Sequence, residues 1–582
     1  MADSVSVTGL GVLCAIGNGT VSVLDSLREK RTGIGEMKYL KTRHRELPVG
    51  EVGLSDSQMK EMLGVEEGTP VGRTSLMGAL AIRQALADAG LGDLSGKRVA
   101  LISGTTVGAM DLTEQYFGRM KTDDSLLGLP KSNDCGKSTR EMARMSGLEG
   151  AETCTVSTAC SSALNSIMVG SEMLLRDEAD IVVAGGSEAL TRFHLNGFNT
   201  LMILDSGNCR PFDADRAGLN LGEGAAFVVL EKNAGERSLA YVAGYGNRCD
   251  AFHQTASSPD GEGAYLAMTE ALEMAGLRPD QIQYVNAHGT GTPNNDVSES
   301  HALQRVFGDS LPEISSTKGF TGHTTSASGS IETVICILAM RHGFTPANLG
   351  WKTPMPDGIV PTEGRDGVDI ENAVCNSFGF GGNDSSIVLS RKEHLFPSGG
   401  QDFSVEVLAD ETVTEADSLA ELKDFNVSPM ESRRMGKLMK ASLLSALKAL
   451  RNAGVGCPSA VITATERGML DVSLQFLDEI EANGEEQLRP TLFMQSTHNT
   501  LGSAIAIRTG CHGYNITYSH GDRSFEWAMR DAERQIRTGK AETVLVGSYD
   551  ESTPLYDSLV TRAGQTAPRP LYARSVVLGR KK

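Results

Sequence analysis

One cysteine lies in a position that suits a nucleophile. Cys160 follows the strand-like run 154–158 and precedes a run with the apolar spacing of a helix, which begins at Ala163. A thiol at such a junction faces unpaired backbone N–H groups and the positive end of the helix dipole, and both favour the thiolate. Cysteines are also common as small buried apolar side chains. This stretch alone leaves both interpretations open.

Three polar segments further along the chain could complete a site. Each follows a short strand-like run, and loops at the carboxyl ends of strands are where α/β sheets build sites. The segments are 286–299 with His288, 315–324 with Lys318 and His323, and the glycine-rich 376–384. Taken singly, each histidine more often has a structural role. Together with Cys160 they offer a thiol, two imidazoles, an ammonium and backbone donors for an oxyanion.

Length, charge and cysteine usage narrow the class of protein. The 582 residues exceed one hydrophobic core, and the net charge of −19 argues against nucleic-acid binding. The ten cysteines include no Cys-x-x-Cys pair, so neither a disulfide framework nor a zinc site is expected. We see no basic leader and no apolar run of membrane length. We therefore expect a cytoplasmic protein without membrane attachment, metal or cofactor.

Helical and strand-like patterns alternate along the first two thirds of the chain. Residues 76–89 have helical periodicity, and 99–103 and 179–186 are buried strand-like runs closed by glycines. This alternation is typical of parallel βαβ units. The sequence therefore predicts an α/β fold.

The full set of motifs resembles the β-ketoacyl-acyl-carrier-protein synthases, decarboxylating condensing enzymes of the thiolase superfamily. The resemblance spans residues 3–392 and rests on motifs in the family's order: VTGLGV, STACSS, RPFD with GEGAAFVVLE, NAHGTGTP, STKxxTGH and NSFGFGG. It implies a thiolase-like αβαβα layered fold of two βαβαβ-type halves, expected at residues 1–250 and 251–395. It also implies condensation of an enzyme-bound acyl group with malonyl carrier protein, in fatty-acid or specialised polyene or polyketide-type lipid synthesis.

The resemblance assigns roles to the polar residues. Cys160 would accept the acyl chain from a thioester. His288 and His323 would donate to the malonyl thioester carbonyl as carbon dioxide leaves. Lys318 would pair with Glu332 and help to position the histidine loop.

The resemblance also implies how the site is supported and closed. The backbone N–H groups of Cys160 and Phe380 would form the oxyanion hole. Supporting acids are expected at Asp296 and Glu299. The aromatic side chains that would form the acyl gate are Phe198, Phe378 and Phe380.

The residue types fit decarboxylative condensation on chemical grounds as well. Loss of carbon dioxide produces an enolate that needs donors, and no base has to remove a carbon-bound proton. A thiolase would need a second catalytic cysteine, which none of the polar segments offers. A scaffold or chain-length partner usually loses the nucleophile, and Cys160 would be surplus in a malonyl decarboxylase. Both remain alternatives.

Some residues depart from the family pattern. The gate motif continues as Gly381-Gly-Asn383-Asp384 where the family usually has Gly-Gly-Thr-Asn, which could change a hydrogen bond near the gate. Residues 324–328 also differ from the usual run. A basic docking patch for a carrier protein is not evident, and Arg210 and Arg216 are candidates that could equally be ordinary ion-paired arginines.

The last third of the chain repeats the first. After an expected linker at 396–425, residues 426–582 echo the opening half, and the ungapped alignment puts Asp522 under Cys160. Aspartate cannot form the thioester, and no second set of histidine segments follows. We expect a degenerate, non-catalytic domain that packs on a synthase or shapes its acyl tunnel, with structural roles for His512 and His520.

The resemblance implies two kinds of partner. One is an acyl carrier protein that delivers acyl and malonyl groups. The other is a second copy of the chain, because family members are homodimers. The interface is expected near Ile181–Ala184, with further assembly possible through the C-terminal domain.

Overall fold

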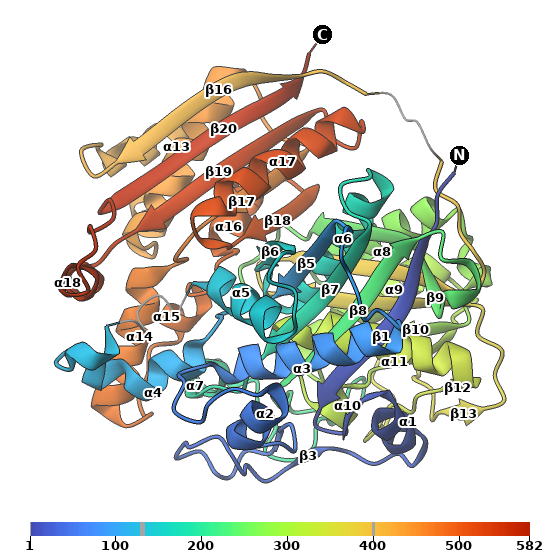
Figure 1. The fold of residues 1–582 in the computed structure, drawn as a ribbon. Coiled ribbons are helices and arrows are strands. Elements are labelled where there is room, and N and C mark those ends of the chain that lie inside the picture. The colour runs from blue at the N-terminus through green and yellow to red at the C-terminus, as the bar shows by residue number, and fades with distance from the viewer. Residues whose placement is uncertain (1, 128–133, 398–401, 582) are drawn as a thin grey trace.

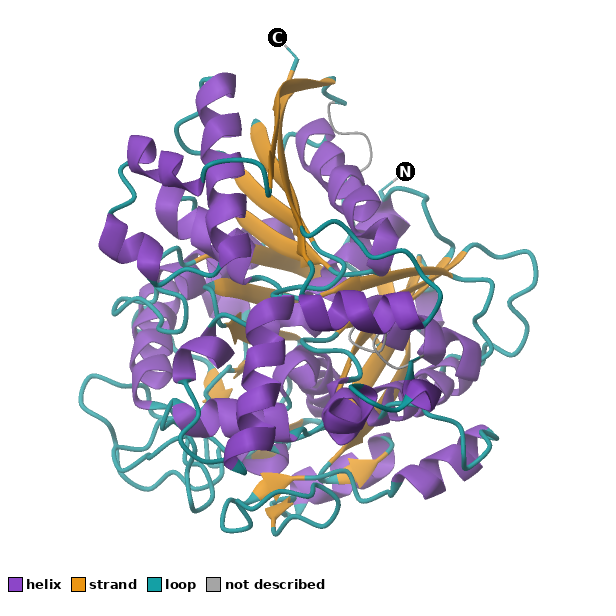
Figure 2. Ribbon diagram, turned by 90° about the vertical axis from the view of Figure 1, so that its left-hand side faces the viewer, coloured by secondary structure: helices purple, strands orange, loops and turns teal. Residues whose placement is uncertain are grey.

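The computed structural model describes residues 2–127, 134–397 and 402–581. Residues 2–397 form one unit, here the N-terminal unit, and 402–581 form the C-terminal unit, which takes up the upper left and the left side of Figure 1. Seen from the side, the strands of both units lie between helices (Figure 2).

Two apolar helices form the middle layer of the N-terminal unit. Helix α6 (Ser162–Leu175) is buried from Ser162 to Leu174, and α11 (Ser328–His342) is buried from Ser328 to Met340. A helix that is buried on all sides must be covered on both faces. Strands lie on either side of the pair, since α6 packs on β5 and β7 while α11 packs on β8 and β14.

The strands form two halves with helices outside. The first half contains β1 (Val5–Cys14), β5 (Val99–Gly104), β6 (Glu152–Val156), β7 (Ile181–Glu188) and β8 (Gly224–Lys232). The second half contains β9 (Ala240–Cys249), β10 (Tyr284–Asn286), β11 (Glu313–Ser315), β14 (Asn372–Gly379) and β15 (Asn383–Ser390). The outer helices include α3 (Arg73–Asp88), α5 (Cys135–Met145), α8 (Glu262–Ala275) and α9 (Pro293–Phe307). This α-β-α-β-α layering is the one predicted, and a short β1–β9 ladder joins the two halves.

The C-terminal unit repeats the first half only. Its strands, in spatial order, are β18 (Tyr514–Tyr518), β17 (Ala460–Ala464), β19 (Thr543–Glu551), β20 (Leu571–Arg580) and β16 (Val405–Thr414). Its helices include α13 (Lys437–Ala453), α14 (Leu470–Asn483), α15 (Pro490–Met494), α16 (Thr500–Thr509), α17 (Ser524–Arg537) and α18 (Pro554–Arg562). Strand β18, a short turn and α17 correspond to β6, the Cys160 turn and α6.

The two units join edge to edge through equivalent strands. Strand β6 pairs antiparallel with β18, with Val156 opposite Tyr518. The N–H of Ser157 donates to the carbonyl of Thr517 (2.9 Å), and the N–H of Ser519 donates to the carbonyl of Thr155 (3.0 Å). Because corresponding residues exchange the same bonds, the joint has the pseudo-twofold geometry of an isologous dimer. One chain therefore contains a dimer-like pair of related units.

The prediction that a homodimer interface lies near Ile181–Ala184 is wrong. Strand β7, which holds these residues, is hydrogen-bonded to β5 on one edge and to β8 on the other. The edge strand of this half is β6, and the chain's own β18 occupies it. A buried apolar run predicts a strand but does not tell whether that strand is central or at an edge.

The stretch 396–425 was expected to be a linker, but a β-strand takes up part of it. Residues 398–401 lie outside the described part, but β16 (Val405–Thr414) pairs with β20 along its length. Most of β16 is half-buried or exposed and it carries acidic residues, as is usual for an edge strand. That composition is what suggested a linker.

Charged side chains hold α17 against the N-terminal unit. Arg530 contacts Glu152 (2.7 Å) and Glu178 (2.8 Å), and the buried Arg534 contacts Glu178 (3.0 Å) and Asp531 (3.5 Å). Lys540 pairs with Glu172 of α6. The joint is therefore ionic beside the β6–β18 ladder.

Within the described residues, no helix combines the length and the apolar character that crossing a membrane requires.

We expect Arg534→Met to weaken the joint between the units. The change leaves the carboxylates of Glu178 and Asp531 without one cationic partner at a site where the arginine side chain is 4% exposed. Breaking a buried pair costs about 3–5 kcal/mol. Denaturation can be followed by the fluorescence of buried Trp527 in a Trp351→Phe background, because the chain has two tryptophans.

The matched control is Arg574→Met. This arginine pairs with Asp410 on the outer strands, where both side chains are about a third or more exposed. Exposed pairs contribute about 0.2–1 kcal/mol. Equal shifts of the midpoint for the two variants would contradict the role given to Arg534.

Candidate active site

Cys160 sits at the centre of a tight turn between β6 and α6. The turn, Ala159–Ser161, begins with Ala159 in the left-handed region at φ 52°. The hydroxyl of Ser377 donates to the carbonyl of Cys160 (2.9 Å), and the side chain of Asn165 donates to Thr158 (2.8 Å). A non-glycine residue with a positive φ is strained, so it persists only where neighbouring contacts hold it in place. These bonds hold the thiol at the boundary between the two strand layers.

The two histidines come from loops of the second half. The carboxylate of Glu299 accepts from the backbone N–H groups of His288 (2.8 Å) and Gly289 (2.7 Å). The N–H of His323 donates to the carbonyl of Asn220 (2.7 Å) in the first half. Both loops are thereby anchored by their backbones, which leaves the imidazole rings to face the thiol.

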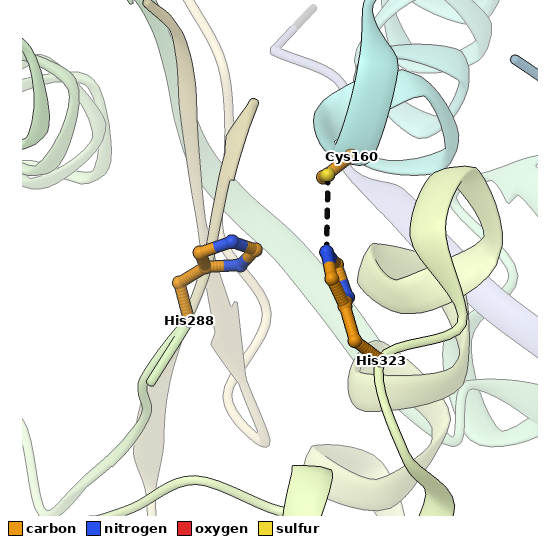
Figure 3. Close-up of side chains that lie close together, drawn as sticks. All are labelled: Cys160, His288 and His323. Carbon is orange, nitrogen blue, oxygen red and sulfur yellow. Dashed lines mark hydrogen bonds between the residues drawn. The ribbon is translucent and has the colours of Figure 1, made fainter. Parts of the chain in front are cut away.

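Cys160, His288 and His323 converge in the interior, as Figure 3 shows. The sulfur of Cys160 lies 3.1 Å from Nε2 of His323. The two imidazole rings are 5.3 Å apart and nearly perpendicular, at 84°. Ligand atoms of all three side chains lie within 4.8 Å of one another. The predicted nucleophile and both predicted donors therefore share one space.

Lys318 lies behind the histidines and contacts Glu332. Its ammonium is 2.6 Å from a carboxylate oxygen of Glu332 and 3.4 Å from Nδ1 of His288, and all three side chains are buried. An ammonium can only donate, so Nδ1 of His288 has to accept. The proton of a neutral His288 is then on Nε2, where it can be donated to a bound group.

Burial and charge keep both imidazoles neutral. The pKa of His288 lies well below its usual value because of burial first and the Lys318 ammonium second. The same two causes lower the pKa of His323. Burial also raises the pKa of Glu332 to about 7, against the opposing effect of Lys318. A neutral imidazole at His323 can accept a proton from the thiol.

The expectation of a resting thiolate at Cys160 is not supported. Burial raises the pKa of the Cys160 thiol to about 12, although Lys318 and the backbone N–H of Phe380 oppose the shift. Desolvation outweighs the helix dipole here. The thiol is protonated at neutral pH, and its proton has an acceptor in His323.

A cavity of about 430 Å³ opens onto the thiol and is lined by the predicted gate residues Phe198, Phe378 and Phe380. Phe198 and Phe380 stack with their ring centres 5.6 Å apart. Phe378 lies 5.7 Å from the ring of His288. Met202 and 255–257 also line this cavity. A thioester arm could approach Cys160 through it.

The remaining predicted residues lie outside this space. Asp296 accepts from the backbone N–H groups of Phe212 (2.7 Å) and Gly291 (3.1 Å), and so supports the loop. Arg216, a candidate for docking, is buried 3.6 Å from Asp296. Arg210 lies near Asp205 at 4.0 Å. The guanidinium of Arg216 is therefore engaged in the interior.

The spacing of Cys160, His288 and His323 also suits a soft metal ion. Such an ion would take up the sulfur that a nucleophilic mechanism needs.

The nucleophile turn is repeated in the C-terminal unit without its chemistry. Asp522 lies at the centre of the turn Gly521–Arg523, between β18 and α17, and is exposed. His520 contacts Thr155 (2.9 Å), and His512 contacts the carbonyl of Cys249 (3.0 Å), so both bridge the units. In the described residues no second half covers this turn.

Two residues of the C-terminal unit reach the gate, and the sequence did not point to them. The ring of Phe493 packs 5.3 Å from that of Phe198. The side chain of Asn499 donates to the carbonyl of Phe380 (2.8 Å). The only sequence signal was the departure at Asn383, which also contacts Asn499.

Comparisons with known families match most of the chain. The family described as "Beta-ketoacyl synthase, N-terminal domain" matches residues 2–235, and its C-terminal domain matches 239–352. A second N-terminal-domain family of the same description matches residues 409–580.

Individual proteins agree with these matches. The 3-oxoacyl-[acyl-carrier-protein] synthase 2 of Staphylococcus aureus (strain N315) is 32% identical over 412 residues, which cover 67% of this chain and 98% of that protein. The solved ishigamide ketosynthase/chain length factor is 30% identical with a TM-score of 0.61, covering 67% of this chain and all of its own. The PfaC ketosynthase–chain length factor shares the fold of the whole chain, with a TM-score of 0.82, 18% identity and coverage of 100% and 78%.

The converging thiol and imidazoles thus lie in a chain whose first two thirds match both ketosynthase domains and whose last third matches the N-terminal one again. This chain belongs to the β-ketoacyl synthase family.

Proposed function

We propose that the N-terminal unit is a β-ketoacyl-acyl-carrier-protein synthase that joins an acyl group on Cys160 to a malonyl group with loss of carbon dioxide. The convergence of the Cys160 sulfur with ring nitrogens of His288 and His323 within 4.8 Å carries this proposal. The name of the Staphylococcus aureus relative supports a carrier-protein substrate.

The first half-reaction loads the acyl group. The proton of the Cys160 thiol passes to Nε2 of His323, 3.1 Å away, while the sulfur attacks the thioester carbonyl. Backbone N–H groups of Cys160 and Phe380, which face the sulfur, stabilise the oxyanion. The carrier thiolate leaves, takes the proton and departs as a thiol.

The second half-reaction forms the new carbon–carbon bond. Once the sulfur is acylated it has no proton to give, so His323 carries its own proton on Nε2 while Nδ1 accepts from the hydroxyl of Ser328 (3.0 Å). Loss of carbon dioxide from the malonyl thioester leaves an enolate, and the Nε2–H groups of His288 and His323 stabilise its oxygen. The enolate carbon attacks the acyl thioester and expels the Cys160 thiolate, which takes a proton from solvent. Lys318 acts through His288, because it keeps the donor proton on Nε2.

We further propose that the C-terminal unit takes the place of a second subunit and does no chemistry of its own. It pairs with the edge strand β6, and its nucleophile position is Asp522. A homodimer through the same edge is excluded while β18 stays docked. The name of the solved ishigamide ketosynthase/chain length factor is in line with a chain-length role. A scaffold role for the whole chain is the weaker alternative, because Cys160, His288, Lys318 and His323 are all retained.

We expect an acyl adduct on Cys160 and on no other cysteine. Wild type incubated with a panel of acyl and aryl carrier-protein thioesters should gain the mass of one acyl group and release a ketoacyl product after malonyl carrier protein is added. Cys160→Ala should gain none. Cys457→Ala is the matched control, because Cys457 is an exposed free thiol and should load as wild type does. A wild type that loads with no primer would refute the synthase proposal.

We expect the double variant Lys318→Met/Glu332→Gln to make turnover sensitive to acid. In wild type both imidazole pKa values lie well below the usual value, partly through Lys318, so the rings stay neutral down to mildly acidic pH. Removing the ammonium raises these pKa values, and protonated rings accept no thiol proton. Burial still lowers both pKa values, so they move back toward the ordinary value without passing it, and kcat/KM should begin to fall at a higher pH than in wild type, about tenfold per pH unit below the pKa of the rings.

The control for charge is Lys318→Arg, which keeps a cation beside His288. Its pH profile should remain flat over the same range even if its rate falls. Parallel profiles for all three proteins would show that Lys318 does not hold the imidazoles neutral.

We expect Phe493→Leu to favour longer primers. The ring of Phe493 packs on Phe198, which lines the cavity, but does not line the cavity itself, so a smaller side chain at residue 493 gives the ring of Phe198 room to move. One methylene in an apolar pocket is worth about 1–3 kcal/mol, so the relative kcat/KM for a primer two carbons longer should rise about tenfold. Phe476→Leu, which contacts Phe493 without a ring contact to Phe198, should leave the preference unchanged.

A further inference from the structure

The gate loop of the N-terminal unit is bonded directly to the C-terminal unit. Asn499 lies just before α16 and is fully buried. Its side-chain Nδ2 donates to the carbonyl of Phe380 (2.8 Å) and to the side-chain oxygen of Asn383 (2.5 Å). Both acceptors flank the Gly381-Gly382 pair, so one amide from the C-terminal unit holds both ends of the turn.

The Gly381-Gly382 turn packs closely against α16. Gly381 has a φ of 86°, and a Cβ atom there would lie 2.1 Å from the hydroxyl of Ser503 and 3.0 Å from Nδ2 of Asn499. Only a glycine fits this approach. The gate loop therefore rests directly on the start of α16.

A chain of buried amides continues from the gate to the nucleophile turn. Asn383 donates to the backbone carbonyl of Asn515 in β18 (3.0 Å), and the N–H of Asn515 donates to Asn247 (2.8 Å). Asn247 donates to Asn165 (2.8 Å). Asn165 in turn donates to Thr158, which begins the Cys160 turn (2.8 Å).

This chain crosses between the units three times, at the bonds Asn499–Asn383, Asn383–Asn515 and Asn515–Asn247. Asn499 and Asn515 belong to the C-terminal unit, and the other amides belong to the N-terminal unit. Breaking one of these bonds would leave a buried polar group unmet, at about 1–3 kcal/mol, so each bond fixes the position of the two groups that make it. Oδ1 of Asn499 and Nδ2 of Asn515 have no partner among the described residues, so they add nothing to the network.

The backbone of Phe380 links this network to the Cys160 site. Its carbonyl accepts from Asn499, and its N–H faces the sulfur of Cys160. The two groups belong to the peptide groups on either side of the Phe380 Cα atom, so a displacement of this Cα atom would move the oxyanion donor and strain the bond to Asn499. The bond restrains that displacement.

We propose that Asn499 is a positioning residue for acyl transfer: through the Phe380 carbonyl, the C-terminal unit holds the oxyanion donor of the N-terminal unit in place. This inference rests on the proposed synthase function and gives the degenerate unit a defined task in the first half-reaction. The enolate of the second half-reaction depends on His288 and His323, which Asn499 does not contact.

The test separates three reactions of the same thiol and site. Asn499→Asp keeps the size of the side chain and replaces the N–H donor by an acceptor facing the Phe380 carbonyl. For each protein we would measure acylation of Cys160 by the thioester that loads wild type fastest, alkylation of Cys160 by iodoacetamide, and carbon dioxide release from malonyl carrier protein. Alkylation forms no oxyanion, so it reports only whether the thiol is accessible and the site folded.

We expect Asn499→Asp to slow acylation by about 10- to 100-fold, since losing an oxyanion donor outright costs about 100- to 1,000-fold. Alkylation and carbon dioxide release should stay within about twofold of wild type. The matched control is Lys540→Met, which breaks another contact between the units, at Glu172, away from the gate. All three of its rates should stay near those of wild type.

Asn499→Ser is the second variant, in case the aspartate disturbs folding. A serine is too short to reach the carbonyl from the same position but adds no charge, and its acylation should fall in the same way. Acylation within twofold of wild type in a variant that is alkylated normally would overturn the inference. So would an equal fall of acylation and alkylation, which would indicate a structural role. Failure of wild type itself to load would refute the synthase proposal and the inference together.

Discussion

The open edge of strand β6 is the constraint on which the arrangement of the chain depends. A strand edge exposes backbone N–H and C=O groups that need partners, and an unpaired edge invites association with other chains. Here β18 supplies those partners from within the chain, through the paired bonds of Ser157 with Thr517 and of Ser519 with Thr155. Each of these strands is followed by the turn that begins its helix. The pairing therefore also places the C-terminal unit next to the turn that holds Cys160.

The buried ion pair of Lys318 and Glu332 contributes more to the state of the two histidines than to the stability of the fold. Taking two charges out of water costs about as much as their attraction returns. The pair nevertheless sits in the interior, where one oxygen of Glu332 has no hydrogen-bond partner among the residues that the structure describes. What the ammonium contributes is a donor to Nδ1 of His288 and a field that keeps the imidazole rings neutral. Both effects decide which ring nitrogens carry protons, and the condensation depends on that.

The sequence predicted the layered fold and the residues that meet in the site, because glycine-rich segments after strands carry the motifs in order. It did not predict which strand forms the edge. Strands β6 and β7 both appear as short apolar runs, and their order in the sheet depends on pairings between distant segments. Asn499 and Phe493 were missed for a related reason. A single amide or ring has no periodicity, and its role arises only from a contact with Phe380 or Phe198, far away in the chain.

The two halves of the repeat show why one kept its chemistry and the other did not. Ala159 and Gly521 open the same turn with φ angles of 52° and 61°, so the backbone geometry at Cys160 and Asp522 is alike. The difference lies in what covers the turn. Helix α6 packs on α11 and is buried from Ser162 to Leu174. Helix α17 has no counterpart of α11 among the described residues, and its Arg530 and Arg534 contact Glu178 of the N-terminal unit instead. Among the described residues the turn has no counterparts of His288 and His323, because these come from the second half. A thiol there would lack the groups that a condensation needs, whereas an exposed carboxylate is well solvated. The strand edge, by contrast, needs only the first half, and that is the part the repeat retains.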